Sequence, residues 1–566
     1  AGMVRGTIKE VLGDPGRPDV AMEGIMRQYG LSEEFPEAVL EEAKQLPAAL
    51  SEEKIREELA LGRRDLRELR TMTIDGKDAR DLDDAVSIRE EERGEVRLWV
   101  HIADVSYYVK EDSPLDIEAY KRGNSVYLAD RVLPMLPPKL SNGICSLNPG
   151  QARLAMNCEL LFNKEGRQID GDIYESVICS DLRANYEDIK KSMDGNPPED
   201  YAAYMTEIKA METLARKLSE AAEFRGALDF EFPETKVEMA ADGTVKAICP
   251  EPHSFANEIS EQFMIAANRF VAEVFTELSL PFLYRVHDWP DPEKLERFRE
   301  ALKRQGKTIK LSANPNPREL SAVLEDLHLM PGAAALQNLL LRSLAKAVYS
   351  SQPIGHYGLA LDDYSHFTAP IRRYSDLFIH RVIRGYLRDQ VKFRHWRRLA
   401  PEVAEQCSER ERNAIDAERD SVDQKVVEYY AERIGEVYDA EVTGLIPAGI
   451  FVMLPSSAEG MIPFREMADY YVYDELSMTA RGKDYGGVFT IGDRFPVRIA
   501  RADVVRRQLD LVMVDEEAFV RKNKASRKSR QGGRRSNAHH ARKNKKPKRR
   551  RRRDKKTTKK RRGKRR

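Results

Sequence analysis

The residues with the clearest chemical potential lie in one acidic segment, residues 73–86. It reads TIDGKDARDLDDAV and holds five aspartates within ten residues, between two apolar pieces, MTI and AVSI, that are typical of strands. Gathering so many like charges is destabilising unless something neutralises them. A divalent cation would do so, because Mg²⁺ binds carboxylate oxygens together with water and substrate phosphate. Such an ion can activate water for phosphodiester hydrolysis, so the segment is a candidate catalytic metal site.

Two non-catalytic interpretations compete with that site. A calcium-binding loop is excluded, because the template D-x-[DN]-x-[DN]-G-x₅-E does not match the segment. A solvated acidic loop agrees with the composition equally well. The residues of this segment alone therefore leave the choice between a metal site and a solvated loop open.

A second chemical pattern is TAPIRRYSDL, which begins at Thr368. Thr368 can cap a helix and Pro370 suits its first turn, which predicts a helix N-terminus followed at once by Arg372 and Arg373. A helix N-terminus attracts anions, and arginine adds a bidentate fork for phosphate. The competing interpretation is a helical ion pair between Arg372 and Asp376, and spacing alone favours that pair.

The elements that must position these groups alternate between strand-like and helix-like pieces from about residue 71 to 390. Residues 97–109, RLWVHIADVSYYV, are predicted as a strand, and residues 291–305 as a helix with one apolar face. A long charged helix is expected over 400–432. Short strands with glycine turns over 434–516 predict a small barrel. The expected fold class is a mixed α/β catalytic domain followed by an all-β OB-fold barrel.

Charge is distributed unevenly along the chain. The 566 residues include 94 Lys and Arg and 93 Asp and Glu, for a net charge of +1. Residues 521–566 hold 27 of the basic residues and one acid, so the preceding chain carries a net charge of −25. The basic end has almost no apolar content and is expected to be disordered and to bind polyanions. In the acidic body, nucleic-acid contact should be confined to a lined channel.

Several partners and compartments are excluded by pattern. The five cysteines are scattered without a C-x-x-C pair, which indicates reduced thiols and a cytoplasmic location. No apolar run is long enough to span a membrane. The Gly-Lys-Thr at 306–308 resembles the end of a phosphate-binding loop, but Ala301 stands where that motif requires glycine, so no ATP site is expected.

Longer stretches of the sequence resemble one enzyme family. The acidic segment, together with HIADVSYYV, NSVYLADRVLPMLPPKLSNGICSLNPG and YSHFTAPIRRYSDLFIHR, is similar to the catalytic domain of the ribonuclease II and ribonuclease R family, and most similar to its ribonuclease R branch. The likeness extends from about residue 4 to 516. It implies a Mg²⁺-dependent 3′-to-5′ exoribonuclease that works processively and releases nucleoside 5′-monophosphates. The resemblance also favours a catalytic metal site over a solvated acidic loop, and a phosphate-binding role for Arg372 over an ion pair with Asp376.

The resemblance implies roles residue by residue. Asp83 is expected to be most closely tied to the chemical step, while Asp78 is expected to be a solvated loop acid. Arg372 matches the family's catalytic arginine beside the scissile phosphate, and Arg373 is expected to contact the RNA. The expected catalytic and metal-binding aspartates are Asp75, Asp81, Asp83 and Asp84.

Further residues are matched to RNA recognition. Tyr127 matches a tyrosine that stacks near the 3′ end, a contact that tolerates any base; taken alone, it would be a core residue. Phe230 resembles the phenylalanine that closes the other side of the base stack, with Phe232 as the alternative. Glu261 matches an acidic residue associated with ribose recognition in the family. A carboxylate that accepts a hydrogen bond from the 2′-hydroxyl is a physical means of choosing RNA over DNA. Glu418 is expected to act in the same way.

The resemblance also divides the chain and names its partners. The expected divisions are the end of a cold-shock OB fold (1–20) whose remainder precedes this chain, a helical linker (21–70), an RNB-type catalytic domain (71–432), an S1-type OB fold (433–516) and a disordered Lys/Arg-rich tail (517–566). The expected partners are single-stranded RNA and structured RNA with a 3′ overhang, bound by a monomer. The tail is a candidate contact with ribosomes or RNA-decay complexes. Its alternative is a solubilising segment.

Two other functions remain open at this point. A metal-dependent DNA nuclease or endonuclease would use the same acids. An RNA-binding factor with an inactive nuclease domain would use only the barrel and the tail. The presence of all four matching aspartates and of Arg372 speaks against the second.

Overall fold

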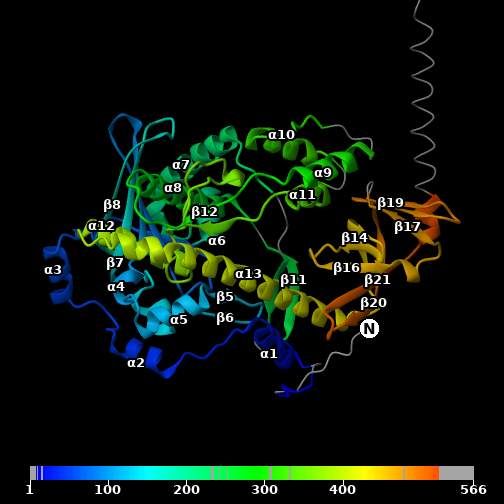
Figure 1. Ribbon diagram of the computed structural model, residues 1–566, viewed down its shortest axis with the longest axis horizontal. Helices are drawn as coiled ribbons and strands as arrows, with labels where there is room; N and C mark the ends of the chain where they lie inside the picture. The colour runs from blue at the N-terminus through cyan, green and yellow to red at the C-terminus, as the bar shows by residue number, and fades with distance from the viewer. Residues whose placement is uncertain are drawn as a thin grey trace, which may run out of the picture.

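A computed structural model gives the arrangement of the chain (Figure 1). It describes all residues except 1–7, 9, 15–16, 231–234, 241, 252, 305–308, 331–332, 476–477 and 522–566. The helices are α1 (Pro18–Tyr29), α2 (Glu37–Gln45), α3 (Glu52–Ala60), α4 (Val105–Tyr108), α5 (Pro114–Arg122), α6 (Tyr186–Met193), α7 (Met205–Arg225), α8 (Phe255–Glu277), α9 (Pro292–Arg304), α10 (Pro317–His328), α11 (Ala333–Leu341), α12 (Tyr374–Leu387) and α13 (Phe393–Ala431).

A seven-stranded sheet forms the centre of the catalytic body, in the order β1-β8-β7-β4-β3-β2-β9. Both outermost pairs, β1 with β8 and β2 with β9, are parallel, and the pairs between them are antiparallel. Almost every residue of β4 is buried, as expected for a strand covered on both faces. The strands are β1 (Arg64–Asp65), β2 (Met72–Asp75), β3 (Asp84–Glu90), β4 (Val96–Ala103), β7 (Ala152–Phe162), β8 (Gln168–Cys179) and β9 (Leu182–Asn185).

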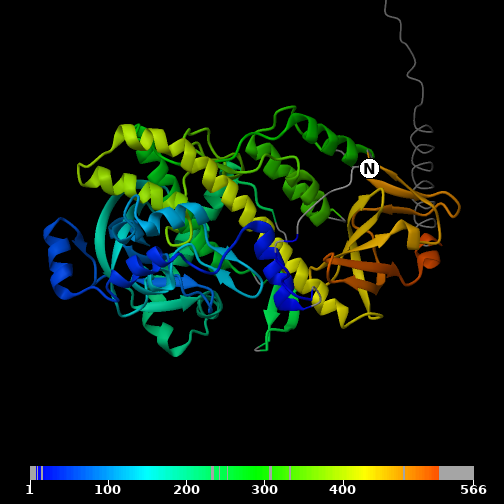
Figure 2. The same cartoon turned by 60° about the horizontal axis from the view of Figure 1, so that its bottom comes forward.

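Helix α13 connects the catalytic body to the C-terminal barrel (Figures 1 and 2). It is 39 residues long and contacts elements as distant in sequence as α1, β13, β11 and β20. The predicted helix over 400–432 is confirmed and begins earlier, at Phe393. The short strands of the body away from the large sheet are β5 (Val126–Tyr127), β6 (Val132–Leu133), β10 (Thr235–Met239), β11 (Val245–Pro250), β12 (Tyr284–Val286) and β13 (Val348–Ser350).

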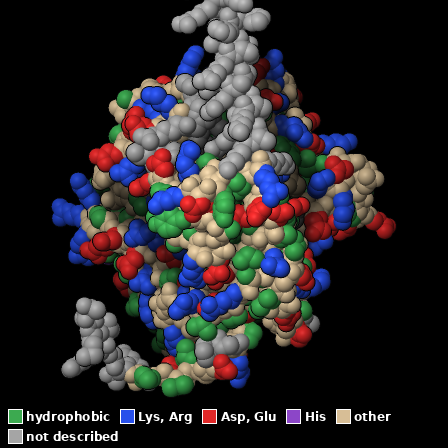
Figure 3. Space-filling view, turned by 90° about the vertical axis from the view of Figure 1, so that its right-hand side faces the viewer, with side chains coloured by type: hydrophobic (Ala, Val, Ile, Leu, Met, Phe, Trp, Pro, Cys, Tyr) green, Lys and Arg blue, Asp and Glu red, His purple; other side chains and the backbone are tan. Residues whose placement is uncertain are grey.

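The predicted small barrel is confirmed: β14-β15-β16-β21-β20 close on themselves. In β20 buried and exposed residues alternate over most of the strand, which is how a strand presents one face to a barrel interior. On the face shown in Figure 3, basic and acidic side chains are interspersed. The strands are β14 (Val437–Ile446), β15 (Gly449–Met453), β16 (Glu459–Pro463), β17 (Tyr471–Asp474), β18 (Thr479–Gly482), β19 (Val488–Thr490), β20 (Arg494–Asp503) and β21 (Gln508–Met513).

Two predicted elements are wrong in extent. The strand expected over 97–109 ends at Ala103, because the buried Asp104 side chain caps the short helix α4 by accepting from the Tyr107 N–H. The helix expected to begin near Thr368 begins at Tyr374, as described with the site.

The ends of the chain bear on two of the expected divisions. The division expected over 1–20 stays a prediction, because residues 18–20 belong to α1 and most of residues 1–16 lie outside the described residues. At the other end, Phe519 stacks on Phe489 with ring centroids 4.9 Å apart and Val520 is buried, so ordered packing continues past residue 516. The rest of the predicted tail, from 522 on, lies outside the described residues.

All five cysteines are free thiols. Among the residues that the structure describes, no helix is both long enough and apolar enough to cross a lipid bilayer.

Candidate active site

The acidic loop between β2 and β3 is fixed to the core by Leu82. This side chain is fully buried, its N–H donates to Ser146 Oγ at 3.1 Å, and its carbonyl accepts from the Leu147 N–H at 3.0 Å. Because both the N–H and the carbonyl of Leu82 are hydrogen-bonded, its neighbours Asp81 and Asp83 are held in place. The apolar residue among the acids is therefore what positions them.

Asp83 is a buried carboxylate with one free oxygen. Its side chain is 3% exposed, Oδ1 accepts from the Ile371 N–H at 2.7 Å, and Oδ2 has no hydrogen-bond partner among the described residues. The nearest cation is Arg372, whose Nε lies 3.7 Å from Oδ2. Burial raises the pKa of Asp83 well above its usual range, although Arg372 and the Ile371 N–H oppose that rise.

Asp75 and Asp84 stand at the two ends of the loop, where β2 ends and β3 begins. Asp75 Oδ2 is buried and likewise finds no hydrogen-bond partner in the described chain. Burial, followed by the charges of Asp84 and Asp81, raises the pKa of Asp75 to about 8. Burial also raises the pKa of Asp84 to about 6, against the opposing charge of Arg372. Without a further cation the cluster is short of positive charge.

The segment that carries the arginines is a turn held by Asp376. The Asp376 side chain accepts from the Ala369 N–H at 2.8 Å and from Arg373 Nε and Nη2 at 2.9 and 2.7 Å. Because the carboxylate takes the Ala369 N–H, residues 370–372 form a turn and the helix starts only at Tyr374. The competing interpretation, an Arg372–Asp376 ion pair, is wrong: Arg373 forms the pair with Asp376, and Arg372 stays half-exposed beside Asp83.

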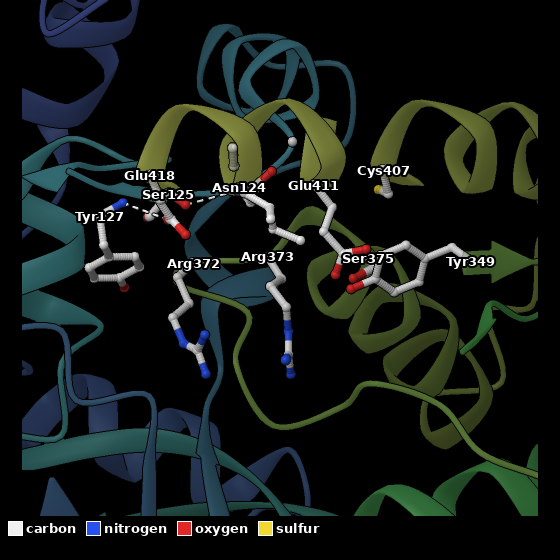
Figure 4. A pocket seen from close by; sticks show the side chains of 13 residues that line it. Asn124, Ser125, Tyr127, Tyr349, Arg372, Arg373, Ser375, Cys407, Glu411 and Glu418 are labelled. Atoms are coloured by element: carbon white, nitrogen blue, oxygen red, sulfur yellow. Dashed lines mark hydrogen bonds between the residues drawn. The ribbon is translucent and has the colours of Figure 1, made fainter. Parts of the chain in front are cut away.

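Tyr127 and Glu418 complete one side of a cavity of about 220 Å³ (Figure 4). The Tyr127 hydroxyl donates to Asp81 Oδ2 at 2.9 Å, and its N–H donates to Glu418 Oε1 at 2.8 Å. Tyr127 is 40% exposed, so a ring face remains available to a ligand. In Figure 4 the side chains of Arg372 and Arg373 lie side by side and point the same way from their turn.

Two predicted RNA contacts are not brought to this cavity. Phe230 is partly buried against the hydrophobic core shared by α9–α11 and the barrel, and does not line the cavity. Phe232, its alternative, lies outside the described residues. Glu261 is exposed on α8, where its neighbour Ser260 donates to the Ile74 carbonyl at 3.5 Å. Glu261 is therefore placed near the end of β2, although it does not line the cavity either.

Three residues at the site were not foreseen: Asp376 as the anchor of Arg373, and Tyr349 and Glu411 as cavity walls. Glu411 accepts from Arg285 Nη1 at 2.6 Å. Its position could have been found from helical spacing, since residues 411, 414, 415 and 418 share one face of α13 and all line the cavity. Tyr349 had no such signal.

The carboxylate oxygens of the acidic loop are the kind of ligand that a hard cation prefers. Two buried carboxylate oxygens, on Asp75 and Asp83, lack hydrogen-bond partners among the described residues, as ligands of an ion would. Within those residues, however, no group of three or more His, Cys, Asp or Glu side chains is arranged to hold a metal by itself. Mg²⁺ is commonly held by one or two carboxylates, with waters and substrate phosphates as its other ligands. The donor set therefore fits an ion that binds together with substrate.

Known proteins match the chain over most of its length. The RNB domain family matches residues 63–389, the S1 RNA binding domain family residues 432–513, and the cold shock domain family residues 2–36. Ribonuclease R of Thermotoga maritima is 42% identical over 520 residues, which cover 90% of this chain and 72% of that protein.

Solved structures share the fold. Mycoplasma genitalium RNase R in complex with ribose-methylated single-stranded RNA aligns with a TM-score of 0.83 and 28% identity, over 89% of this chain and 79% of that one. Yeast Ssd1, a pseudonuclease, aligns with a TM-score of 0.68 and 19% identity, over 83% and 59% of the two chains, which shows the fold alone. With these matches, the chain belongs to the ribonuclease R branch of the RNB-domain family.

Proposed function

We propose that the chain is a processive 3′-to-5′ exoribonuclease that hydrolyses RNA to nucleoside 5′-monophosphates. One observation carries the proposal: a carboxylate oxygen of Asp83, without a hydrogen-bond partner among the described residues, lies 3.7 Å from Arg372 Nε, beside a cavity that Arg372 and Tyr127 both line. Acid, phosphate-binding cation and base-stacking ring thus meet at one place. Family membership supports the same reaction.

Each side chain has a distinct part in this reaction. Arg372 donates to the scissile phosphate and stabilises charge as it develops there. The face of Tyr127 supports the terminal base, while its hydroxyl, bonded to Asp81, fixes the ring. Asp75, Asp81, Asp83 and Asp84 are the acids that would hold Mg²⁺ together with water and substrate phosphate, and the bound ion would supply water activation and Lewis-acid polarisation of the phosphate. Arg373 orients the turn through Asp376 and faces the same cavity.

Ribose selection is assigned to Glu418 and Glu261. Glu418 lines the cavity next to Tyr127 and can accept from a 2′-hydroxyl. Glu261 and Phe230 would contact nucleotides only on a path that extends beyond the cavity toward α8 and the α9–α11 core.

The substrate class is single-stranded RNA and structured RNA with a 3′ overhang. The division into linker (21–70), catalytic domain (71–432) and S1-type barrel (433–516) supports this, since OB folds bind single strands in grooves. The Lys/Arg-rich residues beyond 521 add sequence-independent phosphate affinity and a contact for ribosomes or RNA-decay complexes. The enzyme acts as a monomer in the cytoplasm.

The test is a product-length assay on two duplexes of the same sequence, one blunt and one with a 3′ overhang. With Mg²⁺, the overhang duplex should yield single nucleotides and shorten from its 3′ end, whereas excess chelator should stop the reaction. Equal rates on both duplexes would contradict the overhang requirement. Internal fragments of mixed length, or attack on DNA of the same sequence, would support the rival DNA nuclease or endonuclease.

A further inference from the structure

A second cavity, of about 450 Å³, lies outside the site described above. Its walls come from the end of α7, the loop after β12, the beginning of α10 and the loop at 354–362. The volume lies within the usual range of about 300–1,000 Å³ for small-molecule sites. It is larger than the cavity beside Arg372, so a mononucleotide-sized ligand has room.

Two arginines line this cavity without an ion-pair partner in the described chain. Arg225 is half-buried and its Nε has no hydrogen-bond partner, and neither Arg225 nor Arg318 forms an ion pair among the described residues. Arg269 and Glu273 of α8 act on the charge of Arg225 with opposite signs, and among the described residues that line the cavity the acid is Asp362. A partly buried guanidinium without a partner is costly, and phosphate is the anion that its planar fork fits best.

An exposed aromatic ring stands in the same wall. Trp289 is 56% exposed and its ring packs edge-on against Tyr357 at 5.2 Å, which holds it in place. The two other tryptophans of the chain, Trp99 and Trp396, are buried. A fixed, exposed indole offers a stacking surface for a nucleobase, a contact worth about 1–3 kcal/mol per base.

The cavity is separated from the active site by a row of rings. His356 lies edge-on to His287, in the cavity wall, at 5.2 Å and to Tyr364 at 5.4 Å. Tyr364 contacts His366 at 5.8 Å, and His366 Nδ1 is 2.9 Å from the hydroxyl of Tyr349, which lines the active-site cavity. Contacting rings thus link the walls of the two cavities, which share no lining residue among those described.

We propose that this second cavity binds a nucleotide, with its phosphate on Arg225 and Arg318 and its base on Trp289. The ligand is either a free nucleoside monophosphate, such as the hydrolysis product, or one nucleotide of a bound RNA strand. Both sources present the same chemistry, a phosphate next to a base. Binding at this site does not depend on hydrolysis, so it can fail while the proposed exoribonuclease activity stands, and the reverse also holds.

Tryptophan fluorescence tests the site directly, because Trp289 is the exposed indole. Titrating the full chain with AMP should quench the tryptophan emission, and Trp289→Phe should remove that quenching. Adenosine should bind at least tenfold more weakly than AMP. Arg225→Met, which keeps an unbranched apolar stem, should weaken AMP binding at least tenfold by calorimetry. Arg318→Gln is the second variant, and it changes an exposed residue that should leave folding intact.

The control is Arg398→Met, which changes an exposed arginine of α13 that lines neither cavity and forms no ion pair in the described chain. It should bind AMP as the unmodified chain does. A short oligoribonucleotide, added to the Asp83→Asn variant to prevent hydrolysis, separates the two sources: quenching by the oligonucleotide alone assigns the site to an RNA strand. Failure of both ligands to quench, or unchanged affinity in both arginine variants, would overturn the proposal.

Discussion

Two of the regions that bury carboxylates in this molecule treat them in opposite ways. In the acidic loop at the active site, Asp75 and Asp83 each have a buried oxygen with no hydrogen-bond partner among the described residues. Burial dominates there, so the pKa values of Asp75 and Asp83 are raised. The charged form of these acids is disfavoured until a cation arrives.

The second region is a buried ion network around Arg63, whose side chain is 0% exposed. Arg63 donates to Glu58 at 3.0 Å, to Asp104 at 2.5 Å and to Glu175 at 3.2 Å. Burial alone would raise the pKa of Asp104, but Arg384 and Arg63 outweigh it and hold that pKa below the usual range. Here every acid has an arginine partner.

The contrast separates structural burial from functional burial. The network joins α3, the cap residue Asp104 between β4 and α4, strand β8 and helix α12 with charges supplied by the protein itself, so it is complete without a ligand. The acidic loop, by contrast, leaves buried oxygens of Asp75 and Asp83 without hydrogen-bond partners among the described residues. Buried acids that keep an oxygen without a hydrogen-bond partner are candidates for metal and substrate binding, whereas fully hydrogen-bonded ones hold elements together.

The largest expected effect comes from removing the charge of Asp83, whose Oδ2 has no hydrogen-bond partner among the described residues. Asp83→Asn should lower release of single nucleotides by about a thousandfold, because a preorganised charge at the reacting phosphate is lost. RNA binding, measured by fluorescence anisotropy, should stay near normal. The matched control is Asp78→Asn, an exposed aspartate of the same loop, which should keep full activity. Retained hydrolysis in Asp83→Asn would remove the site assignment.

Breaking the other region should act on stability instead. Arg63→Met leaves Glu58, Asp104 and Glu175 with one partner fewer, and we expect a loss of about 3–5 kcal/mol in the free energy of unfolding. Urea denaturation followed by circular dichroism measures it. Arg64→Met is the control: its ion pair with Asp172 is about half exposed and should contribute about 1 kcal/mol or less. Equal losses in both variants would contradict the comparison.

The two adjacent arginines repeat the comparison within one turn. Arg372→Lys should lower turnover by about a hundredfold without destabilising the fold, because the bidentate fork is lost where phosphate is bound. Arg373→Lys should instead lower the thermal midpoint, since Arg373 is the bidentate partner of the fully buried Asp376. Initial rates and thermal melting curves of both variants test this division of roles. A loss of activity in Arg373→Lys alone would exchange the two roles.

Local patterns in the sequence predicted much of this arrangement. The helix expected over 291–305 is confirmed as α9: Asp291 Oδ1 accepts from the Glu293 N–H at 2.9 Å, and Leu295 and Phe298 are buried on its apolar face. The strands on either side of the acidic loop are confirmed too. In each case the controlling interactions lie within a few residues of one another.

What the sequence could not predict depends on contacts between distant segments. The Arg63 network joins residues as far apart as Glu58 and Arg388, and no spacing rule links them. The start of α12 was misplaced because the Asp376 side chain, seven residues on, takes the Ala369 N–H. The resemblance gave residue roles, yet it did not reveal that Arg373 and not Arg372 pairs with Asp376.

The smallest expected effect concerns the pH dependence of the paired region. Burial would raise the pKa of Glu58, but hydrogen bonds and charge from Arg63 outweigh it and lower the pKa to about 2, from 4.5. A lowered pKa means that ionised Glu58 stabilises the fold fully above pH 4.5 and loses that contribution as the pH falls toward 2. Glu58→Gln should therefore cost about 1–3 kcal/mol at pH 7 and less at pH 3. Urea midpoints of both proteins at pH 7, 5, 4 and 3 measure the difference. A cost that stays constant or grows on acidification would mean that Glu58 is not held by Arg63 as an ionised partner, and the contrast with the acidic loop would then fail.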